Sequence, residues 1–321
     1  MTAADELTPA ARARRFDHQH ARRLRALAYR MLGSRADAED IVQEAWLRWA
    51  EVDESGIDSP AAFLTRMVTH LCLDRLRSAA AQREHYVGVW LPEPLLEDEA
   101  LFGWAPAPEQ QAEFAQDVSI AFMLALERLS PLERAAFLLH DVFDLDHAEI
   151  ARHLGREEAA CRQLVSRARR HVKADYARRE VAAEEAERLT TAFMQAVRSH
   201  DVGALARLLS EDAVLMSDGG GKVTAGPRPL HGGDKVARAF IGFARMPASA
   251  GWRMLPARVN GLPGVLIVDM AAGGRLVQAV GLAPAGEPGQ PARVGALYIQ
   301  RNPDKLAALA RHVTTSLARP S

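Results

Sequence analysis

A short stretch of the sequence concentrates basic side chains. From Cys161 to Lys173 it reads CRQLVSRARRHVK, with five arginine or lysine residues and no acidic residue, although the whole chain has a formal net charge of -1. Guanidinium groups at this density can contact the phosphates of a polyanion and can read guanine edges in a DNA groove. The alternative is an ordinary solvated helix face that happens to carry arginines. The first question is therefore whether this segment binds nucleic acid.

The elements around this stretch favour the DNA-binding interpretation. As a helix, the segment turns an apolar face inward, formed by Cys161, Val165, Ala168 and Val172. A short helix precedes it, and Gly155 permits a sharp turn between the two. This is the pattern of a helix-turn-helix, whose second helix enters the major groove. The side chains expected to contact DNA are Arg162, Gln163, Ser166, Arg167 and Arg170.

Composition narrows the class of protein. A chain of 321 residues suits two or three domains, and 48% hydrophobic with 25% charged residues suits a soluble globular protein. The two cysteines, Cys72 and Cys161, lie far apart and offer no disulfide framework, which fits a reducing cytoplasm. No apolar run is long enough to span a membrane, so we expect no membrane partner. The sequence shows no phosphate loop, HExxH or Ser/His/Asp arrangement, and we expect no metal and no cofactor.

The positioning elements fall into three parts. Residues 16–80 and 118–180 are predicted to be all-helical, and Ser130 with Glu133 forms a capping-box pattern. Between them, residues 92–120 hold seven acidic residues, four prolines and no basic residue, which indicates a linker. Beyond about residue 184, two helices (roughly 184–199 and 201–210) lead into glycine-rich, β-branched segments. This sequence pattern predicts an α+β domain with a largely antiparallel sheet.

Three helical segments carry a family resemblance. DAEDIVQEAWLRWA resembles the core-polymerase-binding helix of extracytoplasmic-function (group 4) RNA polymerase sigma factors, and FLTRMVTHLCLDRLR resembles the helix that recognises and melts the −10 element. The segment from Leu132 to Val172 resembles the domain that binds the −35 element. The segments occur in the order of that family and span about half the chain.

The resemblance implies partners and contact residues. The partners are core RNA polymerase, through its β′ clamp helices and β flap, and promoter DNA, double-stranded at −35 and melted at −10. Relatives often carry asparagine where His70 stands, so the −10 sequence stays open. Residues 52–59 lie where the family captures a flipped base, and because they include no aromatic residue a polar pocket is expected.

The core-binding residues are Asp37, Asp40, Gln43, Glu44 and Arg48, although acidic residues are also common at helix N-termini. The −10 residues are Arg66, His70, Asp74 and Arg77.

Three short strings point to a subgroup of this family. WLPEP (90–94), DGGGK (218–222) and NPDKL (302–306) resemble those of sigma factors with a fused SnoaL-like (NTF2-like) extension, the sigma-J type. In that subgroup the extension is taken to regulate the sigma factor in cis. We expect Trp90 and Leu91 to dock near the other two strings. The interdomain regulatory residues would be Trp90, Leu91, Pro92, Glu93, Pro94, Asp218, Gly219, Gly220, Gly221, Lys222, Asn302, Pro303, Asp304, Lys305 and Leu306.

The predicted fold is multidomain. It comprises an all-α sigma-2 helical bundle, an acidic proline-containing linker with WLPEP, an all-α sigma-4 helix-turn-helix domain and an α+β SnoaL-like domain, over residues 12–80, 81–117, 118–178 and 184–321. The expected function is that of a cytoplasmic alternative sigma factor, not an enzyme.

Alternative functions stay open at the sequence level. One is an isomerase or cyclase with Asp218, His231 or Asp269 as general base, where burial in an apolar strand would raise the pKa of Asp269. Another is a sensor that holds a small-molecule ligand in the C-terminal pocket of a DNA-binding protein. A third is a helix-turn-helix repressor that acts without polymerase. The helix at 37–49 argues against this alternative, because it resembles a polymerase-binding helix.

Overall fold

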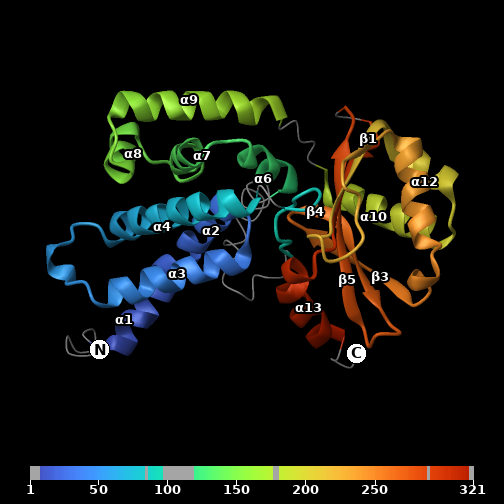
Figure 1. Cartoon of the computed structure of the whole chain (residues 1–321), viewed down its shortest axis with the longest axis horizontal. Helices are drawn as coiled ribbons and strands as arrows, with labels where there is room; N and C mark the ends of the chain where they lie inside the picture. The colour runs from blue at the N-terminus through green and yellow to red at the C-terminus, as the bar shows by residue number, and fades with distance from the viewer. Residues whose placement is uncertain (1–7, 84–85, 97–118, 176–180, 288–289, 318–321) are drawn as a thin grey trace. The chain divides into compact units, whose positions relative to one another are not determined.

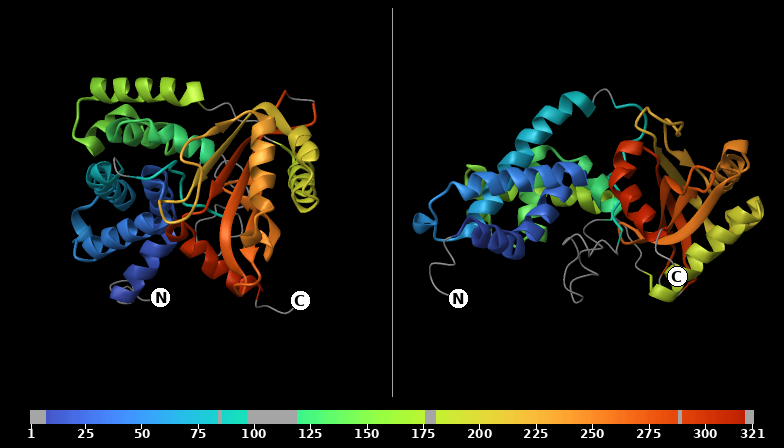
Figure 2. Two further views of the ribbon diagram at one scale, coloured as in Figure 1. Left: turned by 45° about the vertical axis from the view of Figure 1, so that its right-hand side comes forward. Right: turned by 90° about the horizontal axis from the view of Figure 1, so that it is seen from below.

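The computed structural model describes residues 8–83, 86–96, 119–175, 181–287 and 290–317. The chain forms two compact units. Among the described residues, the first unit contains 8–83 and 122–175, and the second contains 86–96, 119–121 and 181–317. Figures 1 and 2 show the helices of the first unit and the sheet with its flanking helices in the second. No described helix is long and apolar enough to cross a membrane.

The N-terminal half of the first unit is a helical bundle around an apolar core. Local sequence sets its helix borders: Gly33 ends α2 with a φ of +69°, and the Ser34 hydroxyl then accepts from the Asp37 amide to cap α3. The core includes Leu27, Met31 and Trp49, each at most 2% exposed. The elements are α1 (Pro9–Phe16), a π-helical turn η1 (Asp17–Ala21), α2 (Arg22–Leu32), α3 (Arg35–Ala50), a 3-10 turn η2 (Glu54–Gly56) and α4 (Pro60–Arg83).

The C-terminal half of the first unit contains the predicted helix-turn-helix. The predicted capping box is present, since Ser130 and Glu133 bond reciprocally at the start of α7. Buried Arg134 connects the halves, because its Nη1 donates to the Met31 carbonyl at 2.6 Å and to Glu127 Oε1 at 2.7 Å. The elements are α6 (Ile120–Glu127), α7 (Pro131–Phe137), a π-helical turn η5 (Leu138–Val142), α8 (His147–Leu154) and α9 (Glu158–Asp175).

The second unit is an α+β fold built on one mixed sheet in the order β2-β1-β6-β5-β4-β3. All neighbours are antiparallel except β1 and β6, which run parallel. Asn260 and Gly261, with φ of +50° and +71°, form the two-residue turn between β3 and β4. The strands are β1 (Leu209–Asp218), β2 (Leu230–His231), β3 (Trp252–Val259), β4 (Leu262–Asp269), β5 (Arg275–Ala285) and β6 (Arg293–Gln300).

Helices cover both faces of this sheet. One face packs against α10 (Ala183–Arg198), α11 (Val202–Leu208) and α12 (Gly233–Ala244), with Phe193 and Phe240 stacked edge-on at 5.1 Å between ring centroids. The other face packs against α13 (Pro303–Leu317) through Leu306, Leu309 and Val313. Because both faces are covered, seven of the eight residues of β4 are buried. A short 3-10 turn, η6 (Pro247–Ser249), precedes β3. The helix expected over 201–210 ends at Leu208, because Leu209 already pairs with Val294 of β6.

Candidate nucleic-acid interface and motif junction

The α8–α9 pair has the geometry of a helix-turn-helix. Gly155 adopts the left-handed conformation (φ +61°, ψ +44°) that ends α8 and turns the chain into α9. The predicted inward face of α9 is confirmed, since Cys161, Val165, Ala168 and Val172 are all at most 7% exposed. The five residues predicted to contact DNA are all exposed on the other side. One helix therefore presents a continuous polar face to solvent.

Several arginines of α9 pair with acidic residues. Arg162 pairs with Glu158 at 2.5 Å on the same helix, and Arg167 Nε lies 2.8 Å from Glu133 Oε1 of α7. The Arg167 guanidinium, with help from Ser130, holds the pKa of Glu133 below its usual value. Arg170 has no ion-pair partner among the described residues. It is the arginine of this face that is most available to a new anion.

Sequence analysis missed the role of Arg169 on this helix. Its Nε lies 2.8 Å and 3.0 Å from the two carboxylate oxygens of Asp141 in η5, and Nη2 also bonds to Oδ1. This two-pronged pair fixes α9 against the π-helical turn η5, as guanidinium–carboxylate geometry favours. The five-basic-residue pattern gave no sign that one arginine is a packing residue, because its partner lies 28 positions away.

The predicted −10 residues lie along α4. Arg66, His70, Asp74 and Arg77 are all exposed, and Arg77 pairs with Asp74 at 2.8 Å. His70 also makes a bond that the sequence did not predict, because its Nε2 lies 2.7 Å from the carbonyl oxygen of His153 at the end of α8.

An aromatic side chain lies near the loop expected to capture a base. The loop itself, residues 52–59, contains η2 and no aromatic residue. Phe63, in the first turn of α4, is 36% exposed, and its ring centroid lies 5.6 Å from that of buried Trp49. An exposed ring braced by a buried one is a surface on which a base can stack. In the sequence, Phe63 could have been noticed as an apolar residue that lies outside the buried stripe formed by Leu64, Val68 and Leu71.

The predicted polymerase-binding residues share α3. Asp37 and Asp40 lie 3.5 Å and 3.9 Å from the two terminal nitrogens of Arg75, and Glu44 pairs with Arg48 at 2.5 Å. Leu47, one turn beyond Gln43 and Glu44, is 59% exposed. An exposed leucine beside acidic and amide side chains can add apolar contact area to a docking face. The sequence pattern did not single it out, because a lone exposed apolar residue is common on a helix surface.

WLPEP, DGGGK and NPDKL lie together in the second unit, and we call this place the motif junction (residues 90–94, 218–222 and 302–306). Its centre is Asp218, which has no solvent-exposed surface. Oδ1 accepts from the Tyr86 hydroxyl at 2.5 Å and from the Gly220 amide at 2.9 Å. Oδ2 accepts from the Leu91 amide at 2.9 Å and from Lys305 Nζ at 2.8 Å. A buried carboxylate is therefore compensated by these four donors and by Gln300 Nε2 at 3.3 Å, as burial of a charge requires.

Lys305 joins Asp218 to the WLPEP segment. Its Nζ donates to the Leu91 carbonyl at 2.6 Å and lies 4.5 Å from the Trp90 ring centroid and 4.9 Å from that of Tyr86. Gln300 Nε2 donates to the Pro92 carbonyl at 3.2 Å. The WLPEP residues Leu91, Pro92, Glu93 and Pro94 are buried. The docking of Trp90 and Leu91 near the other two strings is thus present in the structure, within one unit.

Close packing leaves no room for a side chain at Gly220 of the motif junction. Gly220 has a φ of +58°, and a Cβ added there would lie 2.2 Å from Asn302 Nδ2. Asn302 in turn donates to the Tyr86 hydroxyl at 3.1 Å. Lys222 and Asp304 close the outer rim with a pair at 2.5 Å. Burial, together with the bond to Asp218, raises the pKa of Tyr86 well above its usual range. Tyr86 and Gln300 escaped sequence analysis because they lie outside the three strings.

The three residues proposed as general bases either have structural roles or lie exposed on the surface. Asp269 is not a buried pocket acid: it is half-buried at the end of β4, and Oδ1 accepts from the Ala271 and Ala272 amides to cap a turn. Asp218 is the hub of the junction, and His231 is exposed on β2. Among the described residues, no group of three or more His, Cys, Asp or Glu side chains is arranged to hold a metal ion.

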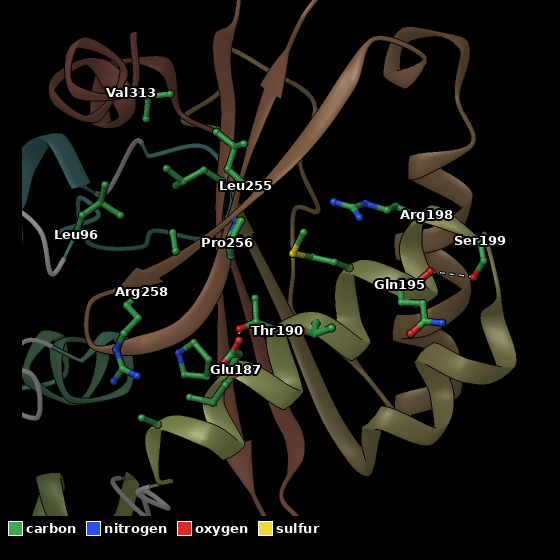
Figure 3. Close-up of a pocket in the computed structure, with 17 residues that line it drawn as sticks. Leu96, Glu187, Thr190, Gln195, Arg198, Ser199, Leu255, Pro256, Arg258 and Val313 are labelled. Atoms are coloured by element: carbon green, nitrogen blue, oxygen red, sulfur yellow. Dashed lines mark hydrogen bonds between the residues drawn. The ribbon is translucent and has the colours of Figure 1, made fainter. Parts of the chain in front are cut away.

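A groove lies elsewhere in the second unit (Figure 3). Its volume is about 1150 Å³, and it runs between α10 and the edge strand β3. None of the three proposed catalytic side chains lines it. Its apolar wall includes Leu255, Pro256 and Leu266, and its polar wall includes Thr190, Gln195 and Arg198.

Comparison with known families defines the class of protein that these helices form. Sigma-70 region 2 matches residues 16–82, and Sigma-70 region 4 matches residues 119–172. The ECF RNA polymerase sigma factor SigJ of Mycobacterium tuberculosis is 42% identical over 261 residues, which cover 75% of this chain and 79% of SigJ. The probable ECF sigma factor SigI of the same organism is 30% identical over 257 residues, covering 79% of this chain and 84% of SigI.

A solved structure extends the match to the second unit. The crystal structure of M. tuberculosis SigJ superposes with a TM-score of 0.68 at 35% identity, over 92% of this chain and 98% of that chain. The chain is a sigma-70-type initiation factor with a SnoaL-like α+β extension. It belongs to the extracytoplasmic-function sigma factors, which bind core RNA polymerase and promoter DNA to start transcription.

Proposed function

We propose that three exposed faces of the first unit divide the work of this sigma factor. The α3 face around Asp40, Gln43 and Glu44, together with Asp37 and Arg48, docks on the clamp helices of core polymerase. The α4 face contacts the melted −10 strand, and the α9 face enters the major groove at −35. The observation that supports this most is that each predicted set lies on one helix with its members exposed, except Asp37, which is half-buried. This work takes place in the cytoplasm, where bacterial polymerase acts.

Run-off transcription with purified core polymerase tests this assignment. Templates are the regions upstream of the chain's own gene and its neighbours. We expect Leu47→Asp to abolish co-purification with core polymerase and all transcripts, because it places a charge at the centre of the docking face. Met270→Asp is the matched control, since Met270 is 47% exposed in the second unit. Full transcription from the Leu47→Asp protein would refute the α3 assignment.

We propose that the motif junction lets the second unit regulate the sigma factor in cis. Support comes from Asp218 and Lys305, which hold the chain segment 86–96 by charge and backbone bonds. This segment lies in sequence between the two sigma regions, so its attachment restricts the path between them. Trp90→Ala and Lys305→Met should change transcript yield at constant core binding. Yield equal to that of the unmodified protein from both variants would contradict cis regulation through the junction.

A small-molecule sensor is the second candidate role of this unit, and the groove beside β3 supports it. An apolar wall facing the exposed guanidinium of Arg198 suits an amphipathic anion. The probe is the fluorescent anion anilinonaphthalene sulfonate. We expect its fluorescence to rise with the full chain and to fall when Thr191→Trp fills the groove. Equal fluorescence from both proteins would argue against a ligand site there.

A further inference from the structure

The bond between His70 and His153 joins two helices that belong to different sigma regions. His70 lies on α4, and His153 lies in the last turn of α8, 83 positions later. The last carbonyls of a helix have no partner within that helix. The His153 carbonyl oxygen accepts from His70 Nε2 at 2.7 Å, and since a carbonyl only accepts, Nε2 must carry the proton. His70 therefore caps the C-terminal end of α8.

His153 itself is buried beneath charged groups from both helices. It is 6% exposed, and its Nδ1 has no hydrogen-bond partner in the described part of the chain. Burial, and then the positive charges of Arg66, Arg152 and His70, lower the pKa of His153, while Glu149 opposes them. Arg66 and His70 face it from α4, and Glu149 and Arg152 lie on its own helix. A neutral imidazole fits this place, and an added positive charge does not.

The same α4 side chains are the ones assigned to the −10 strand. A His70 ring bonded to α8 cannot at the same time bond to a nucleotide through Nε2. We propose that His70 and His153 form a histidine latch that holds α4 against α8 in the free protein, competes with the −10 strand for α4, and opens in acid. The competition rests on the proposed role of α4, whereas the latch and its response to acid do not.

The direction of the pH effect follows from His153. Because its pKa is lowered in the closed form, the stability that its neutral state gives the latch is fully present above the usual histidine pKa of about 6.5. That stability is lost as the pH falls from there through the lowered value. The acid response is assigned to His153, because its buried ring has no hydrogen-bond partner at Nδ1 among the described residues. Other contacts, such as Arg134 with Met31, persist in acid, so opening is partial.

Two measurements on the full chain test the latch without DNA or polymerase. Spin labels are attached to cysteines that replace Ser78 in α4 and Ala160 in α9, the helix that follows α8. They report the distance between α4 and the α8–α9 pair. Both positions are exposed, and native Cys72 and Cys161 are fully buried and resist labelling. At pH 7.5 we expect one short distance, and at pH 5.5 a second, longer population. Amide hydrogen exchange over residues 150–156 should rise several-fold over the same change.

Variants separate the latch from general acid loosening. His70→Ala should open at both pH values, and His70→Gln, which keeps a donor, should restore the closed distance at pH 7.5. His153→Leu should make the distances independent of pH. His147→Gln is the matched control on α8, since its pKa is also lowered but it faces His140. Identical distances and exchange for the unmodified protein and His70→Ala at both pH values would overturn the proposal. Loss of transcription in His70→Gln with normal latch distances would instead concern the −10 role.

Discussion

Nζ of Lys305 lies 2.8 Å from Oδ2 of Asp218, a carboxylate with no exposed surface. The two residues are 87 positions apart, and each also bonds to the backbone of Leu91. The pair therefore has two functions at once: it neutralises a buried charge, and it holds a segment from between the sigma regions. Removing Lys305 leaves the buried Asp218 carboxylate with neutral donors only, which is a damaging way to break such a pair.

Lys305→Met should destabilise the second unit by about 3 kcal/mol, because Asp218 loses the cation of its buried ion pair. Urea unfolding followed by Trp fluorescence measures the change. The control is Lys222→Met at the rim, where the partners are 53% and 64% exposed and the expected loss is at most about 1 kcal/mol. Equal losses from both substitutions would show that Asp218 is compensated in some other way.

Gly220→Ala should lower the stability of the same unit by more than about 2 kcal/mol, because the new methyl group meets the Asn302 amide and the backbone holds a positive φ. Gly273→Ala separates these causes. Gly273 has a φ of +69°, but a Cβ there meets nothing within 4 Å, so its loss should be about 1 kcal/mol. Thermal unfolding of the three proteins gives both values, and a Gly220→Ala loss no larger than that of Gly273→Ala would exclude the clash.

Capping and periodicity rules predicted the helices well. They predicted site contacts only where the interacting residues are close in sequence. The Ser130 capping box, the Gly155 turn and the buried face of α9 follow from spacings of three to eleven residues, and all three are confirmed. The role of Asp218 does not, because its partners Tyr86 and Leu91 are 132 and 127 positions away. No periodicity encodes such a contact.

Asp269 shows why apolar context misleads. Its strand VLIVD predicted a buried acid, but the residue is the last of β4, where the chain turns back to solvent. Burial of a strand says little about the residue at its end, because the backbone amides of the turn compete for its side chain. His70 illustrates the same limit, since its bond to the end of α8 depends on how two helices pack and not on either sequence.

Glu133→Gln should destabilise the first unit at pH 7, and by less near pH 3.5. The pKa of Glu133 is lowered, chiefly by its bond to Arg167, so the stabilisation by its charged form is present above about pH 4.3 and is lost as the pH falls through the lowered value. Urea midpoints for both proteins at the two pH values test this. Glu158→Gln serves as control, because Glu158 and Arg162 are both about half exposed and contribute little at either pH. A Glu133→Gln effect independent of pH would assign its role to the hydrogen bonds of the capping box rather than to its charge.

Arg170→Ala should weaken −35 binding by the holoenzyme and lower the slope of log affinity against log salt by about 1, as expected for one lost phosphate contact. Arg169→Ala should behave differently, because Arg169 is held by both oxygens of Asp141. It should lower the stability of the helix-turn-helix while leaving the salt slope near that of the unmodified protein. Filter binding of a −35 duplex at several salt concentrations, with thermal unfolding of each protein, separates the two roles. A reduced slope for Arg169→Ala with unchanged stability would mean that the Asp141 pair opens on DNA and that α9 offers one more arginine to the groove than the free protein presents.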